Sequence, residues 1–210
     1  WTNAGVLPNA PDENGEKVFA NKLKVKTYMP HNTATYENGH EYIDLGLSVK
    51  WASCNVGATS PEEYGGYYAW GETEEKSDYT WKNYKYYNSS TGGYEYKKLG
   101  SNISGTSYDV ARVKWGGSWR MPRYEDFVEL AQEGIWYWTI SNGVSGYRVY
   151  GPNDNSIFLP YSDYHYWSGT SSEWSQPYDA AMILKLENGL IGYNYHAYRN
   201  SQRHIRPVIN

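Results

Sequence analysis

The sequence is short of several features on which common protein classes depend. A single cysteine, Cys54, cannot form an internal disulfide, so cysteine content neither requires nor excludes an oxidising compartment. No run approaches the ~18 apolar residues of a membrane-spanning helix. No basic cluster is longer than Lys97-Lys98, and 19 Lys and Arg stand against 23 Asp and Glu, which argues against a nucleic-acid partner. Phosphate-binding loops, nucleophile elbows and dinucleotide fingerprints are missing, so the sequence offers no assembled catalytic set.

Aliphatic side chains are scarce as well. Leu, Ile, Val and Phe supply only 33 of the 210 residues, a low proportion that by itself is typical of disordered chains. The 24 Tyr and 10 Trp replace the missing apolar area, since each buries roughly 150–250 Å² when packed. The formal net charge of −4 is too small to expand the chain. We therefore predict a folded domain with an aromatic core, punctuated by glycines.

Composition divides the chain near residue 40. Residues 1–40 are rich in Asn, Pro, Lys and Thr, and we interpret them as a linker that carries one or two edge strands within Lys17–Tyr28. Residues 41–210 consist of short apolar or aromatic runs separated by Gly, Asn, Ser and Pro, which indicates one domain. The sequence begins at Trp1 without an export signal, and we expect it to be a mature fragment.

Helices are expected in three places, and strands follow them. Helix signals cover Ser60–Gly65, Thr106–Trp115 and Pro122–Glu133. The Asn188-Gly189 pair signals a hairpin, and Pro207 demotes the last strand to an edge or bulged position. The expected class is α+β, with short helices in the N-terminal half and antiparallel strands and long loops in the C-terminal half. These strands are expected at Ile135–Ile140, Tyr147–Tyr150, Ser156–Leu159, Ala180–Leu186, Leu190–Tyr195 and Arg203–Ile209.

Seven segments follow one another in a specific order within residues 41–209. They are Tyr42–Leu47, Lys50–Ala58, Tyr67–Thr73, Trp115–Pro122, Ser156–Pro160, Tyr166–Thr170 and Ile205–Val208. Together they resemble the Fibrobacter succinogenes major paralogous domain family, which occurs on exported and surface proteins of gut Bacteroidetes. That family resembles the C-type-lectin-like fold of formylglycine-generating enzymes and of the variable proteins of diversity-generating retroelements. The resemblance implies this fold for residues 41–210, an extracellular or cell-surface location, pairing of the two chain ends, and a ligand face in the C-terminal half.

Two departures from the family pattern are important. Arg123 stands where the family usually has a Thr that caps the following helix, so we expect a weaker cap or a surface role there. The formylglycine-generating relatives use a reactive cysteine pair, which Cys54 alone cannot supply, so that activity is not expected. Cys54 is interpreted as a small buried hydrophobe.

The tryptophans and one arginine are assigned to the scaffold. Arg120 is expected to pair with a buried carboxylate or with carbonyls, and so to lock the turn before the helix at Pro122. The core is expected to contain Trp51, Trp70, Trp115, Trp119 and Trp167.

Metal-binding patterns are weak. Clustering typical of a zinc site is missing among the histidines, which are His31, His40, His165, His196 and His204. Calcium is the cofactor that a lectin-like fold invites, but neither a Glu-Pro-Asn nor a Gln-Pro-Asp tripeptide occurs. Asn153-Asp154-Asn155 is rich in oxygen and is interpreted as a turn. We therefore expect no catalytic residues, no metal site and no cofactor, with calcium dependence left open.

The C-terminal half carries the candidate binding surface. Tyr161–Tyr178 and Gly192–Gln202 are crowded with Tyr, Trp, Ser, Asn and His, the mixture that recognition surfaces favour. Aromatic side chains there can stack on sugar rings or anchor a protein partner. For each of them, burial in the core is the competing interpretation. The predicted ligand-binding residues are Tyr164, His165, Tyr166, Trp174, Tyr178, Asn194, His196, Tyr198, Asn200 and Gln202.

Several functions fit this pattern. The leading one is non-catalytic, extracellular recognition of a glycan or a protein by an adhesin-like or lectin-like domain. A second is a variable protein of a diversity-generating retroelement, whose signature is a near-identical template repeat beside the gene. A structural module of a surface assembly and an enzyme descended from the same scaffold are further alternatives. The second function is suggested by residues that alternate as diversified positions on one strand face would, namely Asn194, His196, Tyr198, Asn200 and Gln202.

Overall fold

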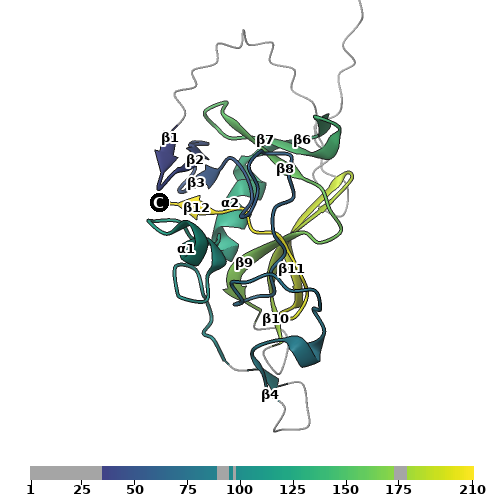
Figure 1. Cartoon of the computed structure of the whole chain (residues 1–210). Helices are drawn as coiled ribbons and strands as arrows, with labels where there is room; N and C mark the ends of the chain where they lie inside the picture. Colours follow the sequence, from purple (N-terminus) through teal and green to yellow (C-terminus); the bar gives the residue numbers. More distant parts are fainter. Residues whose placement is uncertain (1–34, 89–94, 97, 173–178) are drawn as a thin grey trace, which may run out of the picture. The chain divides into compact units, whose positions relative to one another are not determined.

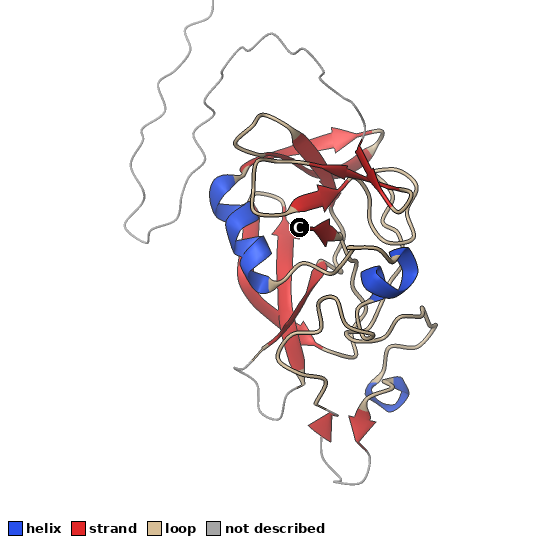
Figure 2. Cartoon of the chain, turned by 90° about the vertical axis from the view of Figure 1, so that its left-hand side faces the viewer, coloured by secondary structure: helices blue, strands red, loops and turns tan. Residues whose placement is uncertain are grey.

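The computed structural model describes residues 35–88, 95–96, 98–172 and 179–210 (Figure 1, Figure 2). All of them belong to one compact unit, Ala34–Asn210. The edge strands expected within Lys17–Tyr28 lie outside the described residues. Within the described ranges, no helix is long and apolar enough to cross a membrane.

A four-stranded antiparallel sheet joins the two ends of this unit. Its strand order is β1-β2-β3-β12, so the C-terminal strand pairs with a strand near the start of the unit. This is the pairing of chain ends that the resemblance implied. The last strand is shorter than the predicted Arg203–Ile209: Pro207 precedes β12, which contains only Val208 and Ile209. β12 lies at the end of the sheet order, the kind of position that Pro207 predicted. The strands are β1 (Thr35–Glu37), β2 (His40–Ile43), β3 (Lys50–Ala52) and β12 (Val208–Ile209).

The C-terminal half supplies two three-stranded antiparallel sheets, in the orders β6-β7-β8 and β11-β10-β9. Their tight turns use residues that tolerate positive φ, with Asn142 at 47°, Gly143 at 83° and Gly189 at 84°. The expected hairpin at Asn188-Gly189 is confirmed by the pairing of β10 with β11. The strands are β6 (Ile135–Ser141), β7 (Val144–Tyr150), β8 (Ser156–Pro160), β9 (Tyr166–Ser171), β10 (Ala180–Glu187) and β11 (Leu190–Tyr198), with a two-stranded pair of β4 (Tyr87–Asn88) and β5 (Glu95–Tyr96).

Two α-helices form where the sequence predicts them. α1 (Val110–Trp115) begins after Asp109, whose carboxylate accepts hydrogen bonds from two backbone N–H groups of its first turn. α2 (Tyr124–Glu133) packs on the β9-β10-β11 sheet (Figure 1). A 3₁₀ turn, η1, covers Trp81–Asn83. The described part is therefore mostly antiparallel strand with few helices, and the two α-helices lie in the middle of the chain rather than in its N-terminal half.

The prediction of a helix at Ser60–Gly65 is wrong, because Ser60–Glu62 form a bend and a turn and Glu63–Gly65 have no regular secondary structure. The Glu63 carboxylate accepts hydrogen bonds from the backbone N–H and hydroxyl of Thr59, as a capping side chain would. Gly65 has a φ of 70°, and Asn55 donates to the Tyr64 carbonyl at 2.9 Å, so tertiary bonds divert the chain after one turn. A capping signature without enough following residues does not nucleate a helix.

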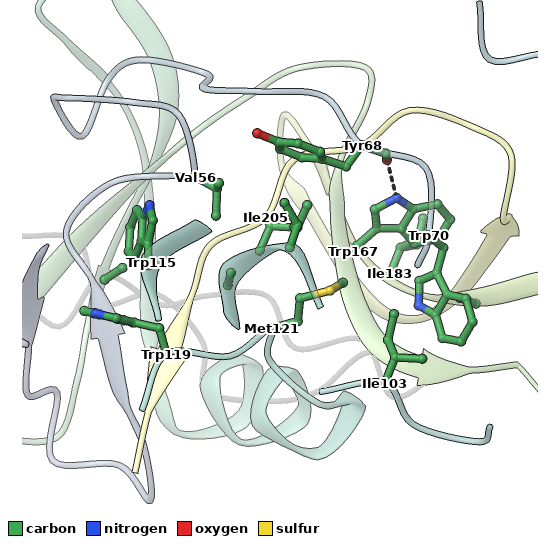
Figure 3. Packing of buried hydrophobic residues seen from close by; sticks show 14 of the residues in the cluster. Val56, Tyr68, Trp70, Ile103, Trp115, Trp119, Met121, Trp167, Ile183 and Ile205 are labelled. Atoms are coloured by element: carbon green, nitrogen blue, oxygen red, sulfur yellow. Dashed lines mark hydrogen bonds between the residues drawn. The ribbon is translucent and has the colours of Figure 1, made fainter. Parts of the chain in front are cut away.

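All five tryptophans assigned to the core are buried, as predicted. Three of their indole N–H groups donate to backbone carbonyls of distant segments, because a buried indole N–H needs a partner. Trp70 donates to the Ser168 carbonyl at 2.9 Å. Trp167 donates to the Tyr68 carbonyl at 2.8 Å, the bond drawn in Figure 3. The third donor is Trp119, whose indole bonds to the Glu37 carbonyl at 2.8 Å. The indoles thus supply both apolar area and long-range hydrogen bonds.

A fully buried guanidinium, that of Arg206, ties the sheets together. It donates to the carbonyl of Ala52 at 3.1 Å, that of Ser53 at 2.6 Å and that of Phe158 at 2.9 Å. Its Nε donates to Oδ1 of buried Asn55 at 2.8 Å. One side chain therefore links the end of β3, the middle of β8 and the C-terminal segment.

Arg120 also has the partner that the sequence predicts. Its Nη1 lies 2.6 Å from the carboxylate of Asp126, and both side chains are buried. The same carboxylate accepts the backbone N–H of Arg123 at 2.7 Å. The Arg123 side chain does not cap the helix. Asp126, three residues later, caps it instead by accepting this N–H.

Replacing Arg120 with Ala should lower the free energy of unfolding by roughly 3–5 kcal/mol, because it leaves the buried Asp126 carboxylate without its cation. Chemical denaturation measures this loss. Arg123→Ala is the matched control, since the cap uses the backbone of Arg123, and we expect a change within about 0.5 kcal/mol. An Arg120→Ala protein as stable as the parent contradicts the assignment.

Candidate ligand-binding site

The predicted binding residues fall into separate groups. Tyr164 and His165 lie in the loop between β8 and β9, and Tyr166 is the first residue of β9, whereas Asn194, His196 and Tyr198 lie on β11. Asn200 and Gln202 follow β11, and Trp174 and Tyr178 lie outside the described residues.

The β11 group is exposed, and the residues after it are not. Asn194, His196 and Tyr198 alternate along the strand and are all solvent-exposed. The Tyr198 ring, 58% exposed, also contacts Trp81 edge-on at 5.2 Å. In contrast, Asn200 is buried and donates to the Tyr79 carbonyl at 2.7 Å, and Gln202 is half-buried. Asn200 therefore holds a loop in place.

The three residues at the start of β9 and just before it have different environments. Tyr166 is fully buried and donates to the Pro160 carbonyl at 2.8 Å, and burial raises its pKa to about 12, so it belongs to the core. His165 is half-buried with a φ of 52°, and burial, aided by Arg203, lowers its pKa to about 4. Tyr164 is 39% exposed. Of these three, Tyr164 offers an open aromatic surface.

Tyr164 lines a cleft that brings together three distant segments. We call it the tyrosine cleft; its volume is about 480 Å³. The segments are the loop around Tyr64 and Tyr67, the β6–β7 turn and the β8–β9 loop. The lining residues are Tyr64, Tyr67, Gly143, Val144, Ser145, Tyr161, Ser162, Asp163 and Tyr164. Of the cleft tyrosines, the sequence predicts Tyr164 as a binding residue and includes Tyr161 in a candidate binding segment. It misses Tyr64 and Tyr67, because nothing in the linear pattern places residues 64–67 beside residues 161–164.

Ring contacts hold the cleft tyrosines in position. The rings of Tyr67 and Tyr164 meet edge-to-face at 5.2 Å, with 81° between their planes. Buried His204 lies against Tyr67 at 4.6 Å and stacks on Tyr64 at 5.7 Å. The Tyr161 hydroxyl donates to the exposed Asp163 carboxylate at 2.9 Å. The cleft thus combines ordered aromatic rings with hydroxyl and carboxylate groups.

The loop that carries Tyr164 is fixed by its own hydrogen bonds. Arg203 donates to the Tyr164 carbonyl at 2.7 Å, and the Tyr164 N–H donates to Ser162 Oγ at 3.3 Å. The loop is therefore already ordered. A ligand bound there would cause little further loss of conformational entropy in the loop, which favours affinity.

Among the described residues, Ser162 and His204 are arranged as a nucleophile and its base would be. Ser162 Oγ lies 2.7 Å from His204 Nε2. Burial, together with the charges of Arg203 and Arg206, lowers the pKa of His204 to about 4, so the imidazole is a poor base and its cation is disfavoured. No carboxylate of the described residues bonds to its Nδ1. The hydrogen bond between the two side chains links the β8–β9 loop to the C-terminal segment beside the cleft.

Other reactive groups are occupied by structural contacts. The Cys54 thiol lies 3.4 Å from the Ala58 carbonyl, and burial raises its pKa, as for an unreactive cysteine. The amides of Asn153 and Asn155 both donate to the Asp44 carbonyl, as in a fixed turn. In the part of the chain that the structure describes, no three His, Cys, Asp or Glu side chains converge as a metal site would require.

Comparison with known proteins identifies no relative: no protein-family model, no curated protein and no solved structure matches this chain. Function is therefore inferred from the residues and their geometry.

His204 should make stability depend on pH below 6.5. Its pKa is about 4 when folded and about 6.5 when unfolded, so the unfolded chain binds the extra proton first as pH falls. The contribution of His204 to the free energy of unfolding is fully present above pH 6.5. It falls by about 3 kcal/mol as the pH drops to about 4, because the folded and unfolded pKa values differ by about 2.5. His165 acts in the same direction.

Unfolding free energies measured between pH 7 and 4 test this. His204→Phe keeps a ring against the tyrosines and removes the proton site, so its pH dependence should be smaller by that amount. Exposed His196→Phe is the control and should leave the dependence unchanged. An unaltered slope in His204→Phe contradicts the assignment.

Proposed function

We propose that this chain is a non-catalytic recognition domain of an extracellular or cell-surface protein, and that it binds a glycan in the tyrosine cleft. The observation that carries the proposal is the convergence of Tyr64, Tyr67, Tyr161 and Tyr164 around one cleft. Tyrosine rings provide flat apolar faces for the C–H surface of a sugar, and their hydroxyls reach its polar edge.

The size and polarity of the cleft support a small carbohydrate epitope. A volume of about 480 Å³ lies within the range of sites for small ligands, ~300–1,000 Å³. Asp163 and Ser162 also line the cleft, and the exposed Asp163 carboxylate can accept hydrogen bonds from sugar hydroxyls. A protein ligand is the competing partner, and it would need a wider surface.

The scaffold is proposed to be C-type-lectin-like. Three features support this: the pairing of β12 with β3, the small number of helices, and the buried Trp119-Arg120 turn before α2. The low pKa of His204 supports the non-catalytic assignment.

A variable protein of a diversity-generating retroelement is the second candidate. The exposure of Asn194, His196 and Tyr198 on one strand favours it, because diversified positions must reach solvent. Asn200 weighs against it, since its amide holds the Tyr79 carbonyl and a substitution there would disturb the loop.

A glycan and protein array tests the proposal with matched variants. Tyr67→Ala and Tyr164→Ala should each weaken binding roughly tenfold or more, as expected when an aromatic anchor is removed. Tyr36→Ala is the control, because Tyr36 is 62% exposed on β1 and does not line the cleft. Parallel arms with calcium and with chelator should bind equally, because the cleft carries one carboxylate.

Melting temperatures establish that the variants are folded. Binding that survives both cleft variants but is lost in Tyr198→Ala moves the site to β11. Binding of a protein alone, with no glycan, contradicts the proposed ligand class.

A further inference from the structure

The outer edge of β6 is unoccupied in the described part of the chain. β6 pairs only with β7, through seven consecutive residue pairs from Ile135–Tyr150 to Ser141–Val144, without a bulge. In Figure 1 it lies at the outer side of the β6-β7-β8 sheet. The edge is therefore straight and regular along its full length.

The hairpin geometry defines which backbone groups point outward. Asn142 and Gly143 form a two-residue turn with φ values of 47° and 83°, so the flanking pair Ser141–Val144 exchanges hydrogen bonds. Bonded pairs alternate along an antiparallel ladder. The N–H and C=O groups of Trp136, Trp138 and Ile140 consequently face away from β7. None of them has a backbone partner among the described residues.

The sequence of β6 carries none of the usual protection of an edge strand. Ile135–Ser141 contains no charged residue, proline or glycine, and most of its residues are strong strand formers. Ile135 and Ile140 are 51% and 67% exposed, unusual for isoleucine. Uncharged, apolar edges of this length pair with another strand.

Three other edge strands, β1, β11 and β9, are protected or covered. β1 has three residues and ends at Glu37, whose carbonyl accepts the Trp119 indole. β11 contains Gly192 and has an irregular register with β10. The outer edge of β9 is bonded to other segments, for example Trp167 N–H to the His204 carbonyl. β6 is thus the edge that best fits a partner strand.

We propose that β6 pairs with β6 of a second copy of this chain, antiparallel, about a twofold axis at Trp138. Trp138 would then bond to the partner's Trp138, and Trp136 to the partner's Ile140 in both directions. All outward groups of the strand are satisfied, and two three-stranded sheets become one of six strands. An uncharged strand meets its own copy without repulsion, and Ile140 is covered by the partner's Trp136.

This pairing would place two tyrosine clefts in one assembly. The β6–β7 turn, through Gly143, Val144 and Ser145, lines the cleft of its own copy. If the proposed function holds, a dimer binds clustered glycans with higher avidity than one domain. The dimer itself does not depend on that function.

Sedimentation velocity of the full chain over a range of concentrations tests the pairing. The parent should show a concentration-dependent dimer. Ile140→Lys adds the charge that natural edges use, and Ile140→Pro removes an outward N–H that β7 does not need, so both should raise the dimer dissociation constant at least tenfold while keeping the melting temperature.

Two controls separate the interface from folding. Val113→Lys adds the same charge at another exposed β-branched residue, which lies on α1 and is 49% exposed. It should leave the dimer intact. Thr139→Pro removes an N–H that bonds to Gly146 in the hairpin and should lower the melting temperature. A parent that stays monomeric at all concentrations overturns the proposal, as does a dimer that persists in folded Ile140→Lys and Ile140→Pro.

Discussion

The buried guanidinium of Arg206 is the constraint on which the rest of this structure depends. Burial lowers the pKa of this guanidinium. Its hydrogen-bond partners are three backbone carbonyls and the side chain of Asn55, and none of them is a carboxylate. Asn55 in turn donates to the Tyr64 carbonyl, so the network reaches the tyrosine cleft in two steps. His204, two residues before Arg206, lies beneath the cleft rings. The same segment that closes the fold therefore positions the candidate site.

The aromatic core explains how a chain so poor in aliphatic residues folds. Indole N–H groups of Trp70, Trp119 and Trp167 reach carbonyls that are far away in the sequence, so each ring contributes area and a directional bond. Such bonds pin loops that have few helices to support them. The cost of a satisfied buried polar group is small, whereas leaving it unsatisfied costs about 1–3 kcal/mol, so these contacts also select one arrangement.

The sequence allowed local features to be predicted better than the site. Arg120 and the Asn188-Gly189 hairpin were predictable, because each depends on chemistry within a few residues. The helix predicted at Ser60–Gly65 does not form, because the tertiary hydrogen bond from Asn55 outweighs a local capping signal. Tyr166 and Tyr164 are two residues apart and equally aromatic, yet only the packing of β9 decides which is buried. The tyrosine cleft depends on contacts between residues about 100 positions apart, which no periodicity reveals.

The central claim is that ordered tyrosines of the cleft, held by the Arg206 network, are the surface that meets the ligand. Ring resonances of selectively labelled tyrosines, followed by NMR during titration with a glycan that the domain binds, test it most directly. We expect shifts at Tyr64, Tyr67, Tyr161 and Tyr164, with Tyr36 and Tyr198 unchanged. Shifts confined to Tyr195 and Tyr198 on β11, with silent cleft rings, would contradict it.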